Sequence, residues 1–287
     1  MSEAIALQGV TRRQGNFQLG PITLTVPRGA VLAFVGPNGA GKTTTLDLLM
    51  GMGRADSGRI AMLGLEWPRD EVAIKARTAY VNPDLNFQPW GTVGRVLDFL
   101  SGFYPDWDNA RCDVLLKTFG VARRERIAAL SFGARMKVAL VAALSRDAEL
   151  LLLDEPTTGL DVAARLALFE EILSFVKRED RTVIISSHQL TDLERLADHV
   201  VILAQGRILS MGRMDELVER YCAVDARGTT NALPDGVKLL GSDGDRLRLL
   251  VDLHAITPAN LAQHGLEVIA EAPMTLEEIF VALTGSP

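Results

Sequence analysis

The feature that most constrains the fold is a glycine-rich segment directly after a short apolar run. Residues 30–35 (Ala-Val-Leu-Ala-Phe-Val) are typical of a buried parallel strand. Gly36–Thr43 then fits the pattern G-x-x-x-x-G-K-[ST], and residues 44–50 continue as a helix-like run. Glycines let successive backbone N–H groups turn towards one anion, and the positive end of the following helix points at the same anion. The sequence therefore predicts a strand, a phosphate-binding loop and a helix, in that order.

The polar side chains of this phosphate-binding loop have predictable roles in binding a nucleotide. Lys42 is expected to reach the β- and γ-phosphates of a nucleotide, and the Thr43 hydroxyl is expected to bind Mg²⁺. The alternative is a glycine-rich turn with an incidental lysine, and the flanking strand and helix argue against it. The predicted phosphate-binding residues are Gly36, Pro37, Asn38, Gly39, Ala40, Gly41, Lys42, Thr43 and Thr44.

Two more apolar runs, residues 150–153 and 182–185, also end in polar residues. Because ligands bind at the carboxyl ends of strands in open parallel sheets, these residues are expected to share a site with the loop. Asp154 is predicted to hold Mg²⁺ through water, and Glu155 to orient or deprotonate an attacking water. His188 is predicted to hydrogen-bond the γ-phosphate and that water. The alternatives are a surface loop for the acidic pair and an ordinary satisfied histidine.

A helical insertion is predicted between the first two of these strands, over residues 84–146. Thr92 is expected to cap one helix, because apolar residues recur on one face after it. A second helix is expected to follow Ser131, again with an apolar stripe.

The chain changes character after residue 221. Two runs with strand character flank a Ser-Asp-Gly-Asp turn, which indicates a hairpin, and Thr275-Leu276-Glu277-Glu278 forms a capping box before a helix. We therefore predict a main domain over residues 1–221 and a small α+β accessory domain over residues 222–287.

Composition argues against several classes of protein. A formal charge of −6 over 287 residues disfavours a nucleic-acid binder, which usually carries a basic stripe. No apolar run approaches the roughly 20 residues that cross a bilayer, and no secretory signal is visible. Cys112 and Cys222 lie far apart without partners at metal-ligand spacing, so both are expected to be reduced thiols.

Together, residues 3–220 resemble the nucleotide-binding domain of ABC transporters. Gly36–Thr43 correspond to Walker A, residues 150–155 to Walker B with its catalytic glutamate, and His188 to the switch histidine. Gly159-Leu160-Asp161 corresponds to the D-loop, which places Asp161 at the predicted nucleotide site. The resemblance implies an α/β P-loop NTPase fold of ABC type, with a mostly parallel sheet, an N-terminal antiparallel β part and the helical insertion. It also implies ATP and Mg²⁺ as ligands.

In that family, two domains sandwich two ATP molecules, and each site joins one subunit's phosphate loop to the other's signature segment. The usual signature is Leu-Ser-Gly-Gly-Gln, and residues 130–134 read Leu-Ser-Phe-Gly-Ala here. Ser131 and Gly133 are retained, so a hydroxyl and a helix N-terminal amide are expected to face the partner's γ-phosphate. Phe132 and Ala134 replace a glycine and the glutamine.

Two further positions depart from the family pattern. Pro83 stands where the Q-loop glutamine is expected, and Asn82, Asp84 or Gln88 are the possible substitutes. Gln14 stands where an adenine-stacking aromatic is expected. Phe17 is the alternative stacking residue, and its other interpretation is a core side chain.

The resemblance implies an ATP-hydrolysing transporter subunit that drives export through separate permease subunits at the cytoplasmic face of a membrane. Its second ATPase subunit is either an identical chain or a sibling. Residues 274–285 are similar to the ending of exporter-type subunits. Phe87, Trp90 and Trp107 are expected either to receive a short coupling helix of the membrane subunit or to form the core of the insertion.

Two other functions are alternatives to this one. One is a nucleotide-gated regulatory module with little turnover, which the changes at Phe132 and Pro83 favour. The other is an ATPase of the same family that acts on DNA or ribosomes. The acidic composition and the lack of a long coiled coil or a second ATPase domain disfavour it.

Overall fold

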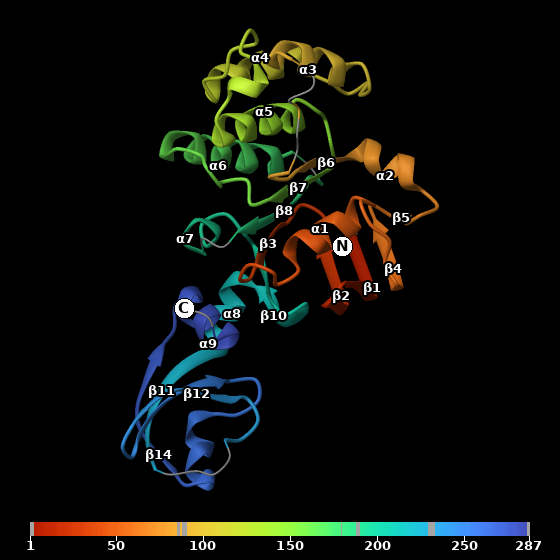
Figure 1. The fold of residues 1–287 in the computed structure, drawn as a ribbon. Helices are drawn as coiled ribbons and strands as arrows, with labels where there is room; N and C mark the ends of the chain where they lie inside the picture. The colour runs from red at the N-terminus through yellow and green to blue at the C-terminus, as the bar shows by residue number, and fades with distance from the viewer. Residues whose placement is uncertain are drawn as a thin grey trace.

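The computed structural model describes residues 3–84, 87, 91–178, 180–187, 190–228 and 233–285. Figure 1 shows a group of helices at one end of the molecule, a central region built on sheets, and a separate sheet at the other end. The separate sheet belongs to the C-terminal part of the chain.

A six-stranded sheet forms the centre, in the order β10-β9-β3-β8-β7-β6. Its strands are β10 (Arg207–Arg213), β9 (His199–Ala204), β3 (Val31–Val35), β8 (Thr182–Ser187), β7 (Leu150–Asp154) and β6 (Thr78–Val81). Only β10 runs antiparallel to its neighbour among these described strands. The predicted mostly parallel sheet is therefore confirmed.

Strand β3 is apolar throughout because both faces of the sheet are covered. Along β3, Val31, Ala33 and Val35 belong to one buried cluster, while Leu32 and Phe34 belong to another on the opposite face. Successive side chains of a strand point to opposite faces, so a strand that is buried on both sides favours apolar residues at every position.

An antiparallel sheet packs against one face of this layer, and the predicted N-terminal antiparallel part is confirmed. Its order is β2-β1-β4-β5, with β2 (Phe17–Pro27), β1 (Glu3–Gln14), β4 (Ser57–Met62) and β5 (Leu65–Glu66). Helix α1 (Lys42–Leu49) contributes Leu46, Leu48 and Leu49 to the core that the two sheets share.

The other helices of the main region cover the opposite face or connect strands. They are α2 (Glu71–Arg77), α3 (Val93–Ser101), α4 (Asn109–Thr118), α5 (Phe132–Leu144), α6 (Val162–Val176), α7 (Leu190–Leu193) and α8 (Met214–Arg220), with a short 3-10 helix η2 (Ile127–Ala129). The predicted caps are confirmed, since Thr92 accepts from the Arg95 N–H and Ser131 from the Ala134 N–H.

The C-terminal sheet has the order β12-β13-β11-β14. Its elements are β11 (Tyr221–Gly228), β12 (Val237–Asp243), β13 (Arg246–Asp252), the 3-10 helix η3 (Pro258–His264), β14 (Leu266–Pro273) and helix α9 (Leu276–Thr284). The predicted hairpin and capping box are both confirmed. One face of the sheet packs on η3, and α9 packs on α7 and α8, so the extension shares core with the main region.

Two expectations about the whole chain can be compared with the fold. Cys112 and Cys222 are both free. Among the described helices, none is both long enough and apolar enough to span a bilayer.

Candidate functional site

The phosphate loop connects β3 to α1 and curls around its own lysine. The Lys42 ammonium donates to the carbonyl of Gly36 at 2.6 Å and to that of Pro37 at 3.4 Å. A cavity of about 360 Å³ opens over the loop, and its lining residues are Gln14, Phe17, Glu155 and every residue from Pro37 to Thr44. The structure therefore brings the predicted phosphate-binding residues to one cavity, with Gly36 just beneath it through its bond to Lys42.

One glycine of the loop shows why the pattern demands that residue. Gly41 has φ of +109°, a region that other residues rarely adopt. A Cβ there would lie 2.7 Å from a methyl of Leu19 and 3.2 Å from the ring of Phe17. Any side chain at this position would therefore clash with β2 unless the loop moved away from it.

Asp154 and Thr43 meet at the carboxyl end of the sheet. The Ser186 hydroxyl donates to Asp154 Oδ1 at 2.5 Å, and the Thr43 hydroxyl lies near enough to help lower the pKa of the Asp154 carboxyl. Mg²⁺ prefers oxygen ligands and takes one or two carboxylates together with substrate phosphates. A hydroxyl and a carboxylate side by side next to the phosphate loop fit that ion.

Burial controls the charge of Asp154, which is only 1% exposed. Desolvation raises the pKa of this carboxyl, and the hydrogen bonds from Ser186 and Thr43 act in the opposite direction. A cation placed beside it would favour the ionised form further.

Glu155 follows Asp154 and turns its carboxylate towards the lysine of the loop. Its Oε1 lies 3.4 Å from Lys42 Nζ, and both side chains are largely buried. The residue has φ of +45°, a strained conformation for a non-glycine residue. Its backbone N–H donates to Ser186 Oγ at 2.9 Å, which holds the turn in place. A strained backbone of this kind persists only where the surrounding residues hold it, as Ser186 holds the backbone of Glu155 here.

Ser186 was not assigned a role from the sequence, although it belongs to the polar residues after the strand over residues 182–185. It bridges Asp154 and the Glu155 backbone because β7 and β8 pair in register, with Asp154 opposite Ser186. Only the register, which the sequence does not state, shows that this serine faces the acidic pair.

Gln14, at the position of the expected aromatic, and Phe17, the alternative stacking residue, both line the cavity. Gln14 ends β1 and Phe17 begins β2, so the turn that connects these two strands lies beside the phosphate-loop cavity. Phe17 also packs against the second core cluster, so the two interpretations of this residue are compatible.

Ser131, Gly133 and Asp161 are not among the residues that line this cavity. They lie together elsewhere, because a Cβ on Gly133 would stand 1.9 Å from the carbonyl of Gly159. Asp161 caps α6 by accepting from the Ala164 N–H at 2.8 Å and pairs with Lys137 of α5 at 2.7 Å. The D-loop and the signature helix of one chain therefore form a single packed unit.

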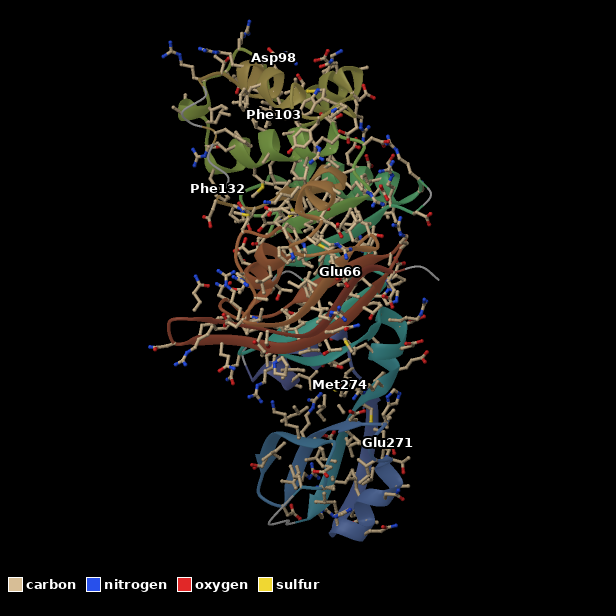
Figure 2. All side chains as sticks on the ribbon, turned by 90° about the vertical axis from the view of Figure 1, so that its right-hand side faces the viewer. Glu66, Asp98, Phe103, Phe132, Glu271 and Met274 are labelled. Atoms are coloured by element: carbon tan, nitrogen blue, oxygen red, sulfur yellow. The ribbon has the colours of Figure 1, made fainter. Side chains whose placement is uncertain are left out.

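Phe132 is part of the same unit and remains 38% exposed. Figure 2 shows it at the border of the helical layer, below Asp98 and Phe103. A Cβ on Gly159 would lie 2.8 Å from the Phe132 ring, so the aromatic side chain packs on the D-loop backbone.

The Q-loop region is described in part. Asn82 is buried, and its Oδ1 has no hydrogen-bond partner within the described part of the chain. Pro83 follows it, and the Tyr80 hydroxyl donates to Asp47 of α1 at 3.1 Å. His188, Gln88 and Trp90, to which the sequence gave possible roles, lie outside the described residues.

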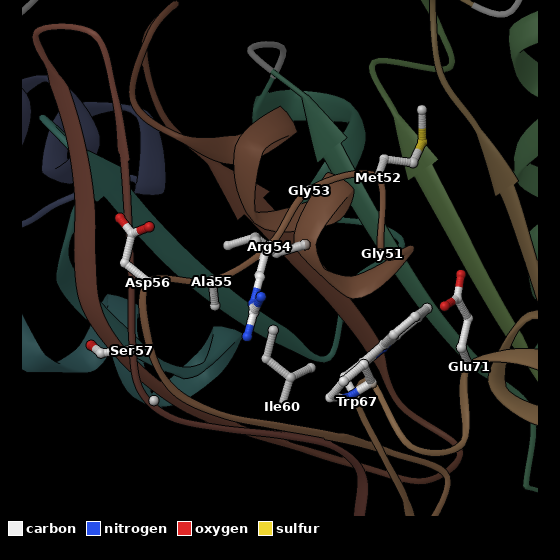
Figure 3. A pocket seen from close by; sticks show the side chains of 13 residues that line it. Gly51, Met52, Gly53, Arg54, Ala55, Asp56, Ser57, Ile60, Trp67 and Glu71 are labelled. Carbon is white, nitrogen blue, oxygen red and sulfur yellow. The ribbon is translucent and has the colours of Figure 1, made fainter.

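A larger cavity, of about 690 Å³, lies away from the loop. Figure 3 shows Arg54, Ile60 and Trp67 extending into it. None of its lining residues belongs to the phosphate loop or the acidic pair, so its size does not make it the candidate site.

Comparison with known proteins agrees with this geometry. The sequence profile of the ABC transporter family matches residues 19–158. An uncharacterized ABC transporter ATP-binding protein of Synechocystis is 32% identical over 237 residues, which span 79% of this chain and 66% of that protein. The Nod factor export ATP-binding protein I of Paraburkholderia xenovorans is 31% identical over 278 residues, spanning 92% of this chain and 91% of that protein. A solved ATP-binding subunit of an ABC transporter superposes with a TM-score of 0.66 at 26% identity, over 75% of this chain and 92% of the other. This chain belongs to the ATP-binding subunits of ABC transporters, a family of ATPases.

Proposed function

We propose that this chain hydrolyses ATP to drive export through separate permease subunits, as a peripheral protein on the cytoplasmic face of a membrane. In this proposal, residues 1–221 are the ATPase domain and residues 222–287 are an accessory domain. Transport by relatives supports the direction, because the Paraburkholderia relative is named for Nod factor export. The ending at residues 274–285, which forms α9, supports the same branch.

The observation that carries the proposal is the convergence of Lys42, Thr43, Asp154 and Glu155 at one edge of the sheet. The Thr43 hydroxyl acts on the Asp154 carboxyl, whose pKa it helps to lower, and Lys42 Nζ lies 3.4 Å from Glu155 Oε1. The loop amides and Lys42 would hold the β- and γ-phosphates, and Thr43 with Asp154 would hold Mg²⁺, which neutralises charge on the phosphates.

Glu155 is the group in position to act on an attacking water. Its carboxylate lines the same cavity as the phosphate loop and lies next to the lysine that would contact the γ-phosphate. A positioned carboxylate that accepts a proton from water contributes about 10²–10⁴-fold to a rate. His188, by its place in the sequence, is proposed to assist at the γ-phosphate.

The proposal requires a second subunit. Ser131 and Gly133 stand at the N-terminus of α5, outside the phosphate-loop cavity of their own chain. They can complete a nucleotide site only if they face the phosphate loop of another chain, and Asp161 would lie at the same interface. The partner subunit is either an identical chain or a sibling.

Glu155→Gln tests the catalytic assignment. The substitution keeps the shape and removes the proton acceptor, so steady-state ATP turnover should fall about 10²–10⁴-fold while ATP binding persists. The variant should then accumulate as an ATP-bound dimer, measured by light scattering after gel filtration. Glu170→Gln, on the exposed face of α6, is the matched control and should keep the turnover of the unmodified chain. Native turnover in Glu155→Gln would refute the role of Glu155.

The packing of Phe132 on Gly159 favours a second candidate, a nucleotide-gated module with little turnover. In that case the unmodified chain would bind ATP and dimerise, but its turnover would match that of Glu155→Gln. The same assay therefore separates the two functions.

A further inference from the structure

The cavity of about 690 Å³ drawn in Figure 3 lies at the end of α1, apart from the phosphate loop. We call it the Trp67 cavity. Its walls come from the last turn of α1 and the segment after it, from β4, and from the segment that joins β5 to α2. Pockets that hold small molecules typically enclose about 300–1,000 Å³. The volume therefore suits a small organic molecule, whereas a single ion would leave most of it empty.

The indole of Trp67 is held in a fixed position at the wall of this cavity. Its N–H donates to the Met62 sulfur at 3.3 Å. The ring lies directly against the backbone of Gly51, where a Cβ would stand 2.4 Å from two ring atoms. Because Trp67 is only half-buried, part of the ring remains open to the cavity. An aromatic ring that is already fixed can pack against a second flat ring with little further loss of entropy.

Other apolar side chains extend the surface that Trp67 begins. Leu48 of α1 and Ile60 of β4 are buried and line the same cavity. Met52, which also lines it, is 58% exposed. Covering this surface removes apolar area from water, which is favourable. The neutral part of a ligand would therefore pack here.

The charged residues of the cavity leave one positive charge unpaired. Figure 3 shows Arg54 extending into the cavity, and Arg54 forms no ion pair or hydrogen bond within the described part of the chain. The two carboxylates of the lining already have partners. Asp56 Oδ2 accepts from the Arg13 N–H at 2.6 Å, and Glu71 pairs with Lys75 at 2.6 Å. An acceptor for Arg54 must therefore come from a ligand or from water.

A second guanidinium lies behind the segment that carries Arg54. A Cβ on Gly53 would stand 2.2 Å from Arg12 Nη1, and this nitrogen is buried without a hydrogen-bond partner among the described residues. Buried polar groups normally have partners, so an unpartnered guanidinium nitrogen is unusual. Arg12 does not line the cavity, but its charge adds to the positive potential there. An anionic group beside Arg54 would therefore be attracted by two cations.

These features together define the ligand. A guanidinium binds a carboxylate through two parallel hydrogen bonds. A phosphate dianion would bring a second negative charge close to Asp56 and Glu71, so a single carboxylate fits the cavity better. We propose that the Trp67 cavity is an effector site for a small aromatic carboxylate, which places its ring against Trp67 and its carboxylate on Arg54.

Helix α1 connects this effector site to the nucleotide. Leu48 lies about 9 Å along the helix from Lys42, at 1.5 Å per residue. A ligand packed against Leu48 therefore contacts the same rigid element whose first residue is the lysine of the phosphate loop. Two ligands that bias the position of one element are coupled, and the coupling is typically about 5–150-fold in affinity. The aromatic carboxylate should therefore change the Kd for ATP at least about fivefold.

The test uses the full chain with 2-naphthoate as the probe. Isothermal titration calorimetry gives the Kd, and the Trp67 indole N–H, followed by ¹H–¹⁵N NMR, reports binding at the cavity. Single Trp→Phe substitutions assign the three tryptophan signals, and the Trp107 indole, outside this cavity, is the internal reference. The comparison ligands are 2-naphthalenemethanol, which lacks the carboxylate, cyclohexanecarboxylate, which lacks the aromatic ring, and 2-naphthyl phosphate, which carries the second charge.

The unmodified chain should bind 2-naphthoate with a saturable shift of the Trp67 signal, and each comparison ligand should bind at least about fivefold more weakly. Arg54→Gln should weaken 2-naphthoate about tenfold, because it removes the bond to a charged group. Trp67→Leu should weaken it about fivefold through the lost ring contact. Arg59→Gln is the matched control, since Arg59 is an exposed arginine of β4 that does not line the cavity, and it should bind as the unmodified chain does.

Three results would overturn the proposal. Absent binding, equal binding of the alcohol, or tighter binding of the phosphate would contradict the ligand class. Native affinity in both Arg54→Gln and Trp67→Leu would place the ligand elsewhere. Binding with an unchanged Kd for ATP would contradict the effector role. Arg54 and Trp67 lie outside the phosphate-loop cavity, so without 2-naphthoate both variants should keep the Kd for ATP of the unmodified chain. None of these measurements depends on ATP turnover, so they are independent of the proposed export function.

Discussion

Ser186 connects the two acidic residues of the candidate site, and its removal tests the electrostatics of that site. The hydroxyl donates to Asp154 Oδ1 at 2.5 Å and accepts from the Glu155 N–H at 2.9 Å. Ser186→Ala removes both bonds at once. Because the position is 0% exposed, water does not replace the hydroxyl without rearrangement.

The expected cost follows from the two groups that lose a partner. An unsatisfied buried N–H costs about 1–3 kcal/mol, and a hydrogen bond to a charged group contributes about 1.5–3 kcal/mol. Ser186→Ala should therefore lower the free energy of unfolding by about 4 kcal/mol at neutral pH. The pKa of Asp154, already raised by burial, should rise further, because the bond from Ser186 favours the ionised form.

The sign of the pH dependence follows from that pKa. A carboxyl whose pKa is higher in the folded state than in the unfolded state stabilises the fold at low pH, and this contribution is lost as the pH rises through the folded-state pKa. Ser186→Ala strengthens this effect, so its cost is largest at neutral pH. Below the folded-state pKa of Asp154 the carboxyl is neutral, so the lost bond to a charged group becomes an ordinary one. The unsatisfied Glu155 N–H then accounts for most of the cost, which should fall to about 2 kcal/mol.

Urea unfolding monitored by circular dichroism, at about pH 7.5 and at an acidic pH below the folded-state pKa of Asp154, measures both values. The matched control is Ser145→Ala, which removes an equally buried hydroxyl that donates to the Val141 carbonyl and touches no carboxylate. The control should cost about 1 kcal/mol at both pH values. Equal costs of Ser186→Ala at the two pH values would refute the assignment of the charge effect to Asp154.

Two more predictions concern the nucleotide and the interface. Phe17→Ala should raise the Kd for ATP about tenfold in an equilibrium titration and leave that for inorganic triphosphate unchanged, because a stacked base contributes about 1–3 kcal/mol. Gln14→Ala, on the same rim, should have a smaller effect if Phe17 is the stacking residue. Gly133→Ala should lower ATP turnover at least tenfold with ATP binding intact, since its Cβ would stand 1.9 Å from the Gly159 carbonyl and displace the D-loop. Unchanged ATP turnover in Gly133→Ala would show that the signature segment and the D-loop can move apart without loss of catalysis.

Local sequence patterns predicted those parts of the fold that depend on few neighbours. The phosphate loop, the helix caps at Thr92 and Ser131 and the capping box at Thr275 each involve residues within a few positions of one another. The buried strands were predictable because a run that is apolar on both faces belongs in the middle of a layered sheet.

The parts that sequence did not predict depend on register and on contacts between distant segments. Ser186 faces the acidic pair only because β8 pairs with β7 at that register. The pair between Lys137 and Asp161 joins two helices that a strand separates in the sequence. The roles of the individual site residues, His188 included, stay predictions.

Helix α1 physically links the phosphate-loop cavity to a second cavity, of about 260 Å³, between β6 and α5. Lys42 begins the helix at the phosphate loop, and Met50, its C-terminal cap, lines the second cavity. At 1.5 Å per residue the helix covers about 12 Å, so one rigid element reaches from one cavity to the other. The bond from the Tyr80 hydroxyl to Asp47 fixes α1 to β6, and Tyr80 itself lines the second cavity. A nucleotide that displaced the loop would therefore move Met50 and strain the bond to Tyr80 together. The wall that Met50 and Tyr80 give to the second cavity would then respond to the occupancy of the phosphate loop.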